Sequence, residues 1–213
     1  MRNMGFDGAA RGMIRYPHLM RSELAIYHPT VWRTCRALMN VRRLACLSVV
    51  LKTPGLSVGE IAVVSGVPEN QASINLRALQ ARGLIAARRK GVHIRYFPEP
   101  DPLVNHAATV LDAVRRELKS GGGHETGRLM DTLRAFTHSR RLTILKCLTL
   151  QADAATEEIV VRARISQPAV WRHMQALRVS GLVCVTKDGA WKLMARRRLS
   201  ALARTLLTVI ENG

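Results

Sequence analysis

The stretch ISQPAVWRHMQALRVSGLV, residues 165–183, carries the strongest structural signal in the chain. Ser166 stands where a serine side chain commonly caps the start of a helix. On a helical wheel of about 100° per residue, Met174 and Leu177 fall within about 40° of Val170, so the three side chains share one face. The stretch therefore predicts an amphipathic helix over residues 166–180 with this face in the core.

A related stretch, VPENQASINLRALQARGLI, lies 98 residues earlier at positions 67–85 and predicts a helix over 68–82. The same shift, without gaps, lays RALMNVRRLACL over RAFTHSRRLTIL, and 14 of the 56 positions from Arg36 to Gly91 are identical to their counterparts. We infer a tandem duplication, because a solenoid needs about three or more repeats. The expected organisation is an N-terminal extension (1–27), a first domain (28–120), a flexible glycine linker (121–123) and a second domain (124–213).

Each copy predicts the same order of elements: four helices, a hairpin and a last helix. The expected landmarks of the first copy are a helix from Pro29 to about Asn40, a helix with Leu44, Leu47 and Leu51, a third helix capped by Ser57 and Glu60 with Ile61 and Val64 inward, a hairpin around Lys90-Gly91 and a last helix from Asp101-Pro102. Those of the second copy are a helix to Thr137, a helix through Leu145 and Leu148, a third helix capped at Thr156, a hairpin around Asp188-Gly189 and a final helix from about Arg197.

Two short helices joined by a tight turn and followed by a hairpin form a helix-turn-helix with a wing. The stretch from Ile165 to Val183 resembles the recognition-helix segment of the ArsR-type (arsenical-resistance-repressor-like) winged-helix regulators. HSRRLTILKCL, from His138, is similar to the second helix of that family. The resemblance covers both copies and is weaker in the first. It implies a mainly α fold with small β-hairpin wings, arranged as two winged helix-turn-helix domains, and a transcriptional regulator that binds double-stranded DNA.

The charge of the chain supports a polyanionic partner. The 213 residues include 33 Lys and Arg against 15 Asp and Glu, a formal net charge of +18. The net charges of residues 1–27, 28–120 and 121–213 are +2, +8 and +8, so the cations are not confined to a tail. Each Lys or Arg placed on a phosphate releases a condensed counterion, which favours DNA binding. The alternative is a chain that is rich in arginine through genomic composition alone.

In the second copy, the wheel predicts that Pro168, Arg172 and Gln175 point away from the core, flanked by Ala169 and Trp171. Arg172 can pair with guanine, or contact a phosphate without reading sequence. Trp171 either touches a thymine methyl group or packs on its own wing or on another helix. The expected DNA contacts of this copy are Gln167, Pro168, Ala169, Trp171, Arg172 and Gln175 on the helix, with Lys187 and Lys192 on the wing.

The first copy differs, because apolar Ile74 replaces Arg172 and acidic Glu69 replaces Gln167, whereas its wing is more basic. We therefore expect the first copy to supply mainly phosphate affinity and the second more of the sequence reading. The alternative is that both wings are only solvated turns. The expected contacts of the first copy are Asn70, Gln71, Ser73, Ile74 and Arg77 on the helix, and Arg88, Arg89, Lys90 and Arg95 on the wing.

The sequence offers no sign of a metal, a cofactor or catalysis. Many ArsR-type regulators sense metals through cysteines on the helix before the recognition helix, but VGEIAVVSG and TEEIVVRAR contain none. The four cysteines, at 35, 46, 147 and 184, are dispersed, and those at 46 and 147 are expected in the core. No apolar run approaches the ~20 residues of a membrane helix, and residues 1–20 lack the apolar core of a secretory signal. We expect a cytoplasmic, nucleoid-associated protein that is not an enzyme and makes no membrane contact.

The apolar stripes at the end of the first copy and the start of the second predict how the copies assemble. Leu103, Val104, Leu111 and Val114 would pack against Leu129, Leu133 and Phe136, which gives an intramolecular pseudo-dimer. A further homodimer, through the helix with Trp32 or the final helix, is the alternative assembly. The rival function is a tandem winged-helix module that docks proteins or takes part in chromosome organisation or replication; exposed Ile74 and Trp171 would favour it.

Overall fold

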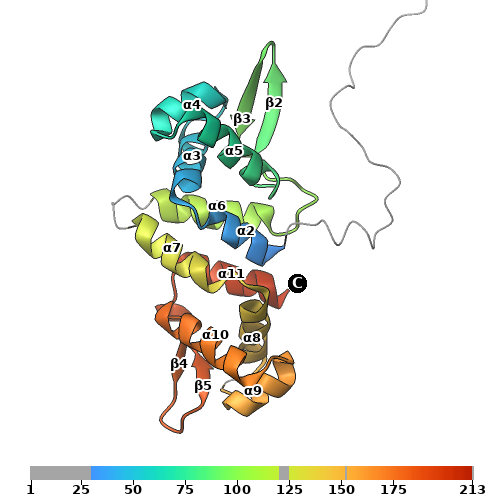
Figure 1. Ribbon diagram of the computed structural model, residues 1–213, viewed down its shortest axis with the longest axis vertical. Coiled ribbons are helices and arrows are strands. Elements are labelled where there is room, and N and C mark those ends of the chain that lie inside the picture. The colour runs from blue at the N-terminus through green and yellow to red at the C-terminus, as the bar shows by residue number, and fades with distance from the viewer. Residues whose placement is uncertain (1–29, 120–124, 152, 213) are drawn as a thin grey trace, which may run out of the picture.

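The computed structural model describes residues 30–119, 125–151 and 153–212. The first half contains α2 (Val31–Leu38), α3 (Val41–Lys52), β1 (Leu56–Ser57), α4 (Val58–Ser65), α5 (Glu69–Gln80), β2 (Ala86–Lys90), β3 (His93–Phe97) and α6 (Ala107–Lys119). The second half contains α7 (Glu125–Ala135), α8 (Ser139–Leu150), α9 (Thr156–Ala163), α10 (Gln167–Val179), β4 (Val183–Val185), β5 (Trp191–Leu193), a short 3₁₀ turn (Arg196–Arg198) and α11 (Ala201–Glu211). The protein is mainly helical, with two small antiparallel sheets. The order of helices and hairpin expected in each copy is confirmed (Figure 1).

Two helix boundaries near the start of the described chain follow local capping. The first helix was expected to reach Asn40, but α2 ends at Leu38. Asn40 instead caps α3, because its side-chain oxygen accepts a hydrogen bond from the Arg43 backbone N–H. The expected start at Pro29 lies outside the described residues.

The last helix of each half begins later than the sequence predicts. Residues 101–106 form turns, and α6 starts at Ala107, because the Asp101 carboxylate accepts a hydrogen bond from the Leu103 N–H and stabilises a turn there. Leu103 is therefore 73% exposed, and the expectation that it joins the apolar stripe is wrong. In the second half, Arg197 lies in the 3₁₀ turn, and α11 begins only after Ser200, whose hydroxyl caps it.

The helices before α5 and α10 start by related but unequal caps. Ser57 and Glu60 form the predicted capping box at α4. At α9 the capping position belongs to Ala155 and not to Thr156, so only the carboxylate of Glu158 contributes, by accepting a hydrogen bond from the Ala155 N–H. The prediction for Val64 is also wrong, because its side chain is 65% exposed while neighbouring Ala62 is buried.

Both hairpins form where the sequence predicts them. β2 pairs with β3, and β4 with β5, in antiparallel register. Gly91 and Gly189 lie in the turns with φ of 64° and 81°, a conformation that glycine adopts without strain. The sequence analysis missed β1, which adds two residues to the outer edge of β3. Backbone hydrogen bonds thus tie the segment before α4 to the first hairpin.

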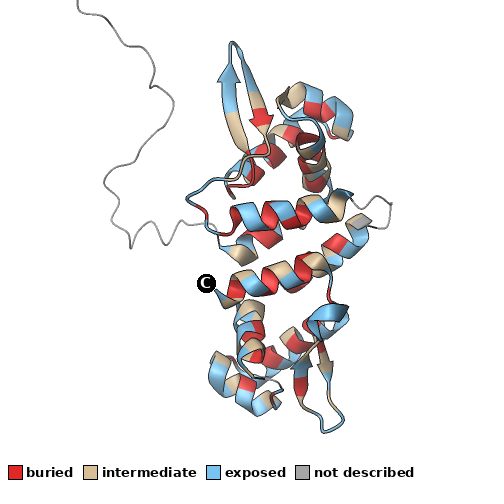
Figure 2. Ribbon diagram, turned by 180° about the vertical axis from the view of Figure 1, so that it is seen from behind, coloured by how far each residue is buried: buried red, intermediate tan, exposed pale blue. Residues whose placement is uncertain are grey.

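The two halves pack against each other through their first and last helices. α6 packs against α11, and α2 packs against α7 (Figure 1). The 98-residue shift lays α2 over α7 and the start of α6 over the second part of α11. By this shift and by their order in each half they are counterparts, so each of these helices contacts its own counterpart. Glu117 on α6 also accepts a hydrogen bond from the Leu202 N–H at the start of α11, at 3.0 Å. Buried residues on these helices, coloured red in Figure 2, belong to one hydrophobic cluster that joins the cores of the two halves.

The molecule is elongated along the line that joins its two hairpins. The hairpin β2–β3 points to one end and the hairpin β4–β5 to the other, with α6 and α11 across the middle (Figures 1 and 2). Among the described residues, no helix has both the length and the apolar character that a membrane crossing requires. The arrangement leaves α5 and α10, one in each half, as candidate contact elements beside their hairpins.

Candidate nucleic-acid interface

Helix α10 has the amphipathic character that the wheel predicts. Val170, Met174 and Leu177 are buried, which confirms the predicted core face. Ala169 is also buried, so the prediction that it flanks the outward face is wrong, because a fourth position of this helix faces the core beside Val170. The candidates on the opposite side are the exposed residues Gln167, Pro168, Trp171 and Arg172, with Gln175 half-buried.

Trp171 packs on its own hairpin while keeping about half of its surface exposed. Its ring lies edge-on to the ring of Trp191 on β5, with centroids 6.0 Å apart. Trp191 is itself buried, and its Nε1–H donates to the Thr156 hydroxyl on α9 at 3.1 Å. These contacts join α9, α10 and β5, so of the alternatives for Trp171 the structure shows packing on its own wing. The position still leaves 54% of Trp171 open to a partner.

A shallow depression of about 510 Å³ lies between α9 and the start of α10. Its lining residues are Thr156, Glu157, Gln167, Pro168, Trp171 and Arg172. Four of these are candidate DNA contacts, so the structure brings the outward side chains of α10 together with the start of α9. Glu157 contributes a negative charge to this surface, which opposes a phosphate and leaves Arg172 as the cation that faces the same depression.

A histidine pair supports α10 from the inner side. His173 on α10 lies against His138, with ring centroids 4.7 Å apart. His138 Nδ1 accepts a hydrogen bond from the Arg140 N–H and so caps α8. Burial, followed by the charges of His138 and nearby arginines, lowers the pKa of His173 to about 4. The pair therefore holds two uncharged imidazoles between the start of α8 and α10 at neutral pH.

Helix α5 presents a less basic surface than α10. Ala72, Leu76 and Leu79 are buried as predicted, and Asn75 joins them. Of the five candidate contacts, Asn70, Ile74 and Arg77 are exposed, and Gln71 and Ser73 are half-buried. Asn70 uses its side-chain oxygen locally, because that atom accepts a hydrogen bond from the Gln71 N–H at 2.7 Å.

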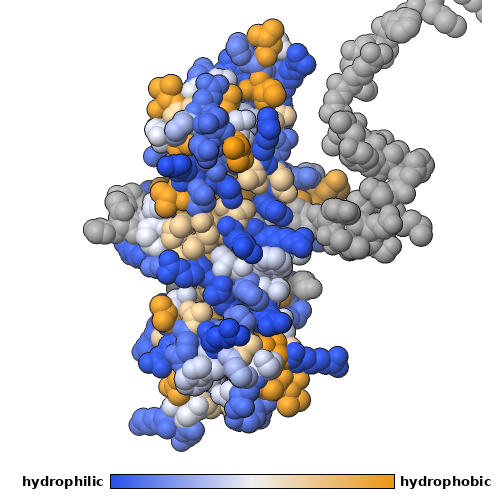
Figure 3. Space-filling model, in the orientation of Figure 1, coloured by the Kyte–Doolittle hydropathy of each residue, from blue (hydrophilic) through white to orange (hydrophobic). Residues whose placement is uncertain are grey.

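Exposed apolar side chains extend from α5 onto the neighbouring helix α4. Ile74 is 55% exposed, and Val63 and Val64 on α4 are still more open to solvent. Glu69, at the start of α5, adds a carboxylate to the same half. In the space-filling view of Figure 3, hydrophilic side chains cover most of the visible face, with separate apolar patches among them.

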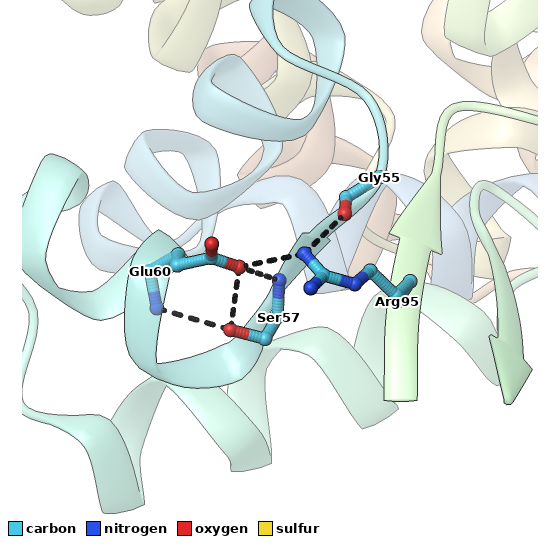
Figure 4. A network of polar contacts seen from close by, with 4 residues as sticks. All are labelled: Gly55, Ser57, Glu60 and Arg95. Carbon is cyan, nitrogen blue, oxygen red and sulfur yellow. Dashed lines mark hydrogen bonds and ion pairs between the residues drawn. The ribbon is translucent and has the colours of Figure 1, made fainter. Parts of the chain in front are cut away.

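The cations of the first hairpin differ in whether their side chains are held by neighbouring groups. Arg95 on β3 donates from one guanidinium nitrogen to the Gly55 carbonyl and to the Glu60 carboxylate, at 3.0 Å each (Figure 4). Hydrogen bonds from the Ser57 hydroxyl and N–H, and the charge of Arg95, lower the pKa of Glu60. Arg95 is thus a structural link between the hairpin and the start of α4.

Of the remaining three cations, Arg88 lies opposite Arg95 in the strand register, and Arg89 and Lys90 lie nearer the tip. Arg88 pairs with Glu99 and stacks over the Phe97 ring at 5.1 Å. Arg89 donates to the Gly91 carbonyl within the turn, and Lys90 is exposed. Arg89 and Lys90 are therefore the candidates best placed to reach a phosphate from this hairpin.

The second hairpin carries the exposed candidates Lys187 and Lys192. The sequence analysis missed a third basic element, the 3₁₀ turn that follows this hairpin. Arg197 and Arg198 are exposed there, whereas Arg196 pairs with Glu211 on α11. The run of three arginines in the sequence was the available signal, but the final helix was predicted to begin within it, at about Arg197.

The cysteines lie in different environments. Cys35 and Cys46 are buried, and burial raises the pKa of both thiols. Cys147 and Cys184 are only half-buried, so the prediction of a core position is confirmed for Cys46 and wrong for Cys147. In the part of the chain that the structure describes, no three His, Cys, Asp or Glu side chains come together in a way that could hold a metal ion.

Comparison with known proteins adds no assignment to this geometry. No protein-family model and no curated protein sequence matches the chain.

Proposed function

We propose that the chain is a DNA-binding transcriptional regulator built from two winged helix-turn-helix domains. The observation that carries the proposal is the repeated unit of α4, α5 and β2–β3 in one half and α9, α10 and β4–β5 in the other, within a chain of net charge +18. In each unit the second helix would enter the major groove, and the hairpin would lie on the phosphates. The ArsR-type resemblance supports the same function. As part of the proposal, the protein acts in the cytoplasm on the nucleoid.

The packing between the halves supports an intramolecular pseudo-dimer. In a two-fold symmetric dimer, each element at the axis contacts its own copy. Here α6 packs against its counterpart α11, and α2 against its counterpart α7, within one chain. The chain would therefore present two recognition helices, about one helical turn of DNA (~34 Å) apart. Because α5 and α10 differ at nearly every outward position, the target would consist of two unlike half-sites.

The two halves would contribute differently to binding. Arg172 and Gln167 on α10 are exposed and chemically able to pair with guanine and adenine. At the positions that correspond to Arg172 and Gln167, helix α5 carries Ile74 and Glu69. Neither of these side chains favours contact with a phosphate or a purine. The first half would instead bind the backbone through Arg89 and Lys90.

Binding to duplex DNA at several salt concentrations tests this function. If the chain neutralises Z phosphates, log K falls with log salt at a slope of about −0.9Z. Exposed candidates Arg89, Lys90, Arg172, Lys187 and Lys192, together with Arg197 and Arg198, could reach phosphates, so a slope between about −4 and −6 is expected for a random duplex. Absence of binding at about 50 mM salt, or a slope near zero, would refute the proposal.

A protein-docking function is the second candidate, and one observation favours it. Val63, Val64 and Ile74 leave apolar side chains exposed on α4 and α5, where a DNA-binding surface would be polar. Replacing Ile74 with arginine, the residue of the second copy, distinguishes the two functions. A DNA-binding surface should gain affinity for random duplex, whereas a loss or no change would favour protein docking at this half.

A further inference from the structure

A pocket of about 950 Å³ lies between the two halves of the molecule. One side is formed by α2 and residues 105–109 of the first half, and the other by α8 and α11 of the second. Pockets that hold small organic molecules commonly measure 300–1,000 Å³ and combine apolar walls with a few polar groups. The size of this pocket, which we call the inter-half pocket, suits a ligand of two or three fused or linked rings.

The walls of the inter-half pocket are mainly apolar and include one aromatic side chain. Trp32 and Val31 at the start of α2 are half-buried, as are Leu142 on α8 and Val209 on α11. Ile210 is buried beside them. A planar apolar ligand would gain both burial and an aromatic contact with Trp32.

The polar part of the lining favours a negative charge on the ligand. Lys146 on α8 is exposed and is the one Lys, Arg, Asp or Glu in the lining. No ion pair of Lys146 occurs among the described residues. Thr109 on the wall of the first half is exposed and adds a hydroxyl group that can donate a hydrogen bond to an anion, whereas the Thr143 hydroxyl on the opposite wall donates to the Ser139 carbonyl at 3.3 Å.

We propose that the inter-half pocket binds a small organic anion with a planar apolar body, such as an aromatic carboxylate or sulfonate. Its rings would lie against Trp32, Val209 and Ile210, and its anionic group would face Lys146. His106 is positioned at the pocket by a hydrogen bond to the Thr34 hydroxyl on α2, at 3.0 Å. The ligand would contact both halves at once.

Binding of 1-anilinonaphthalene-8-sulfonate to the full chain, followed by its fluorescence, tests the site. We expect one site per chain with a Kd on the order of tens of micromolar. Its uncharged parent, N-phenyl-1-naphthylamine, reports the apolar contribution alone. Lys146→Gln should weaken binding of the sulfonate about three- to tenfold and leave the uncharged probe unaffected. Lys187→Gln, an exposed lysine on the distant hairpin, is the matched control and should change neither.

A second variant tests the location independently of charge. Thr143 is exposed, so Thr143→Trp fills the pocket without disturbing the core, and it should weaken both probes at least tenfold. Unchanged sulfonate binding in Thr143→Trp, with a circular dichroism spectrum like that of the parent protein, would overturn the proposed site. Equal weakening of the charged and uncharged probes by Lys146→Gln would overturn the assignment of the anionic group.

A regulatory consequence follows, and it rests on the proposed DNA-binding function. α8 packs against α9 and α10, so a ligand that binds one placement of α8 relative to α2 more tightly than others would favour one placement of α10 relative to α5. Ligand and DNA would then change each other's affinity by the same factor. An equal DNA affinity with and without saturating sulfonate would overturn this role. Failure of the chain to bind DNA at all would refute the proposed function, whereas the two probe titrations would still decide the pocket.

Discussion

Acidification should destabilise the protein through the histidine pair that supports α10. The pKa of His173 is about 4 in the folded protein, against about 6.5 when the ring is solvated. The unfolded chain therefore binds more protons than the folded chain between these values. By linkage, the stability that uncharged His173 contributes to the folded protein is fully present above about pH 6.5 and is lost as the pH falls towards 4. Below about pH 4 the ring is protonated in both states, so this contribution changes no further.

The size of the effect follows from the shift and the exposure of the ring. A shift from 6.5 to about 4 corresponds to an upper bound of about 3.4 kcal/mol, at about 1.36 kcal/mol per unit. Because the ring is only half-buried, solvent screening reduces this value, and we expect a loss of about 1–2 kcal/mol between pH 7 and pH 4.5. The lowered pKa of neighbouring His138 acts in the same direction.

The effect is measured by comparing the parent protein with His173→Gln in urea unfolding at pH 7 and at pH 4.5. Far-UV circular dichroism follows the unfolding. The variant should lose about 1–2 kcal/mol less than the parent on acidification, whatever its stability at pH 7. His93→Gln, which removes an exposed histidine on the first hairpin, is the matched control and should behave like the parent. An identical pH dependence for His173→Gln and the parent would refute the reasoning.

Three further predictions concern the proposed interface and the packing of the halves. Arg172→Ala should weaken binding to a preferred site by about 1–3 kcal/mol and to random duplex by less, measured by fluorescence anisotropy; equal losses would make Arg172 a phosphate contact. Replacing Arg89 and Lys90 with glutamine should weaken all sequences alike and make the salt slope about 1–2 units shallower, and an unchanged slope would remove the first hairpin from the interface. Glu117→Ala removes the acceptor of the Leu202 N–H, so it should lower the free energy of unfolding by about 1 kcal/mol in urea titrations. A Glu117→Ala variant as stable as the parent would show that this bond contributes nothing between the halves.

The parts of the fold that the sequence predicts depend on local signals. The capping box of Ser57 and Glu60 and the turn glycines at 91 and 189 act within a few residues, so they locate α4 and both hairpins. Two boundaries failed because competing local signals were overlooked. The Asp101 side chain stabilises a turn, and Ser200 is a better cap than any residue near Arg197.

The candidate site was less predictable because its side chains depend on distant partners. The wheel places the core face of α10 correctly but misses the burial of Ala169, since the width of that face is set by the packing of neighbouring elements. Arg95 looked like a free cation on a basic hairpin, yet its partners lie 35 and 40 residues away in the sequence. The inter-half pocket forms only where four separate segments meet, so no local pattern indicates it.

Selection of the preferred site from random duplexes, combined with the mass of the resulting complex, tests the central claim most directly. If one chain carries two unlike recognition helices, the selected site should be asymmetric, with two different half-sites about one helical turn (~34 Å) apart. Light scattering or native mass spectrometry should then find one chain on each such site. A selection that enriches no sequence, or a simple palindrome occupied by two chains through the same recognition helix, would contradict the account.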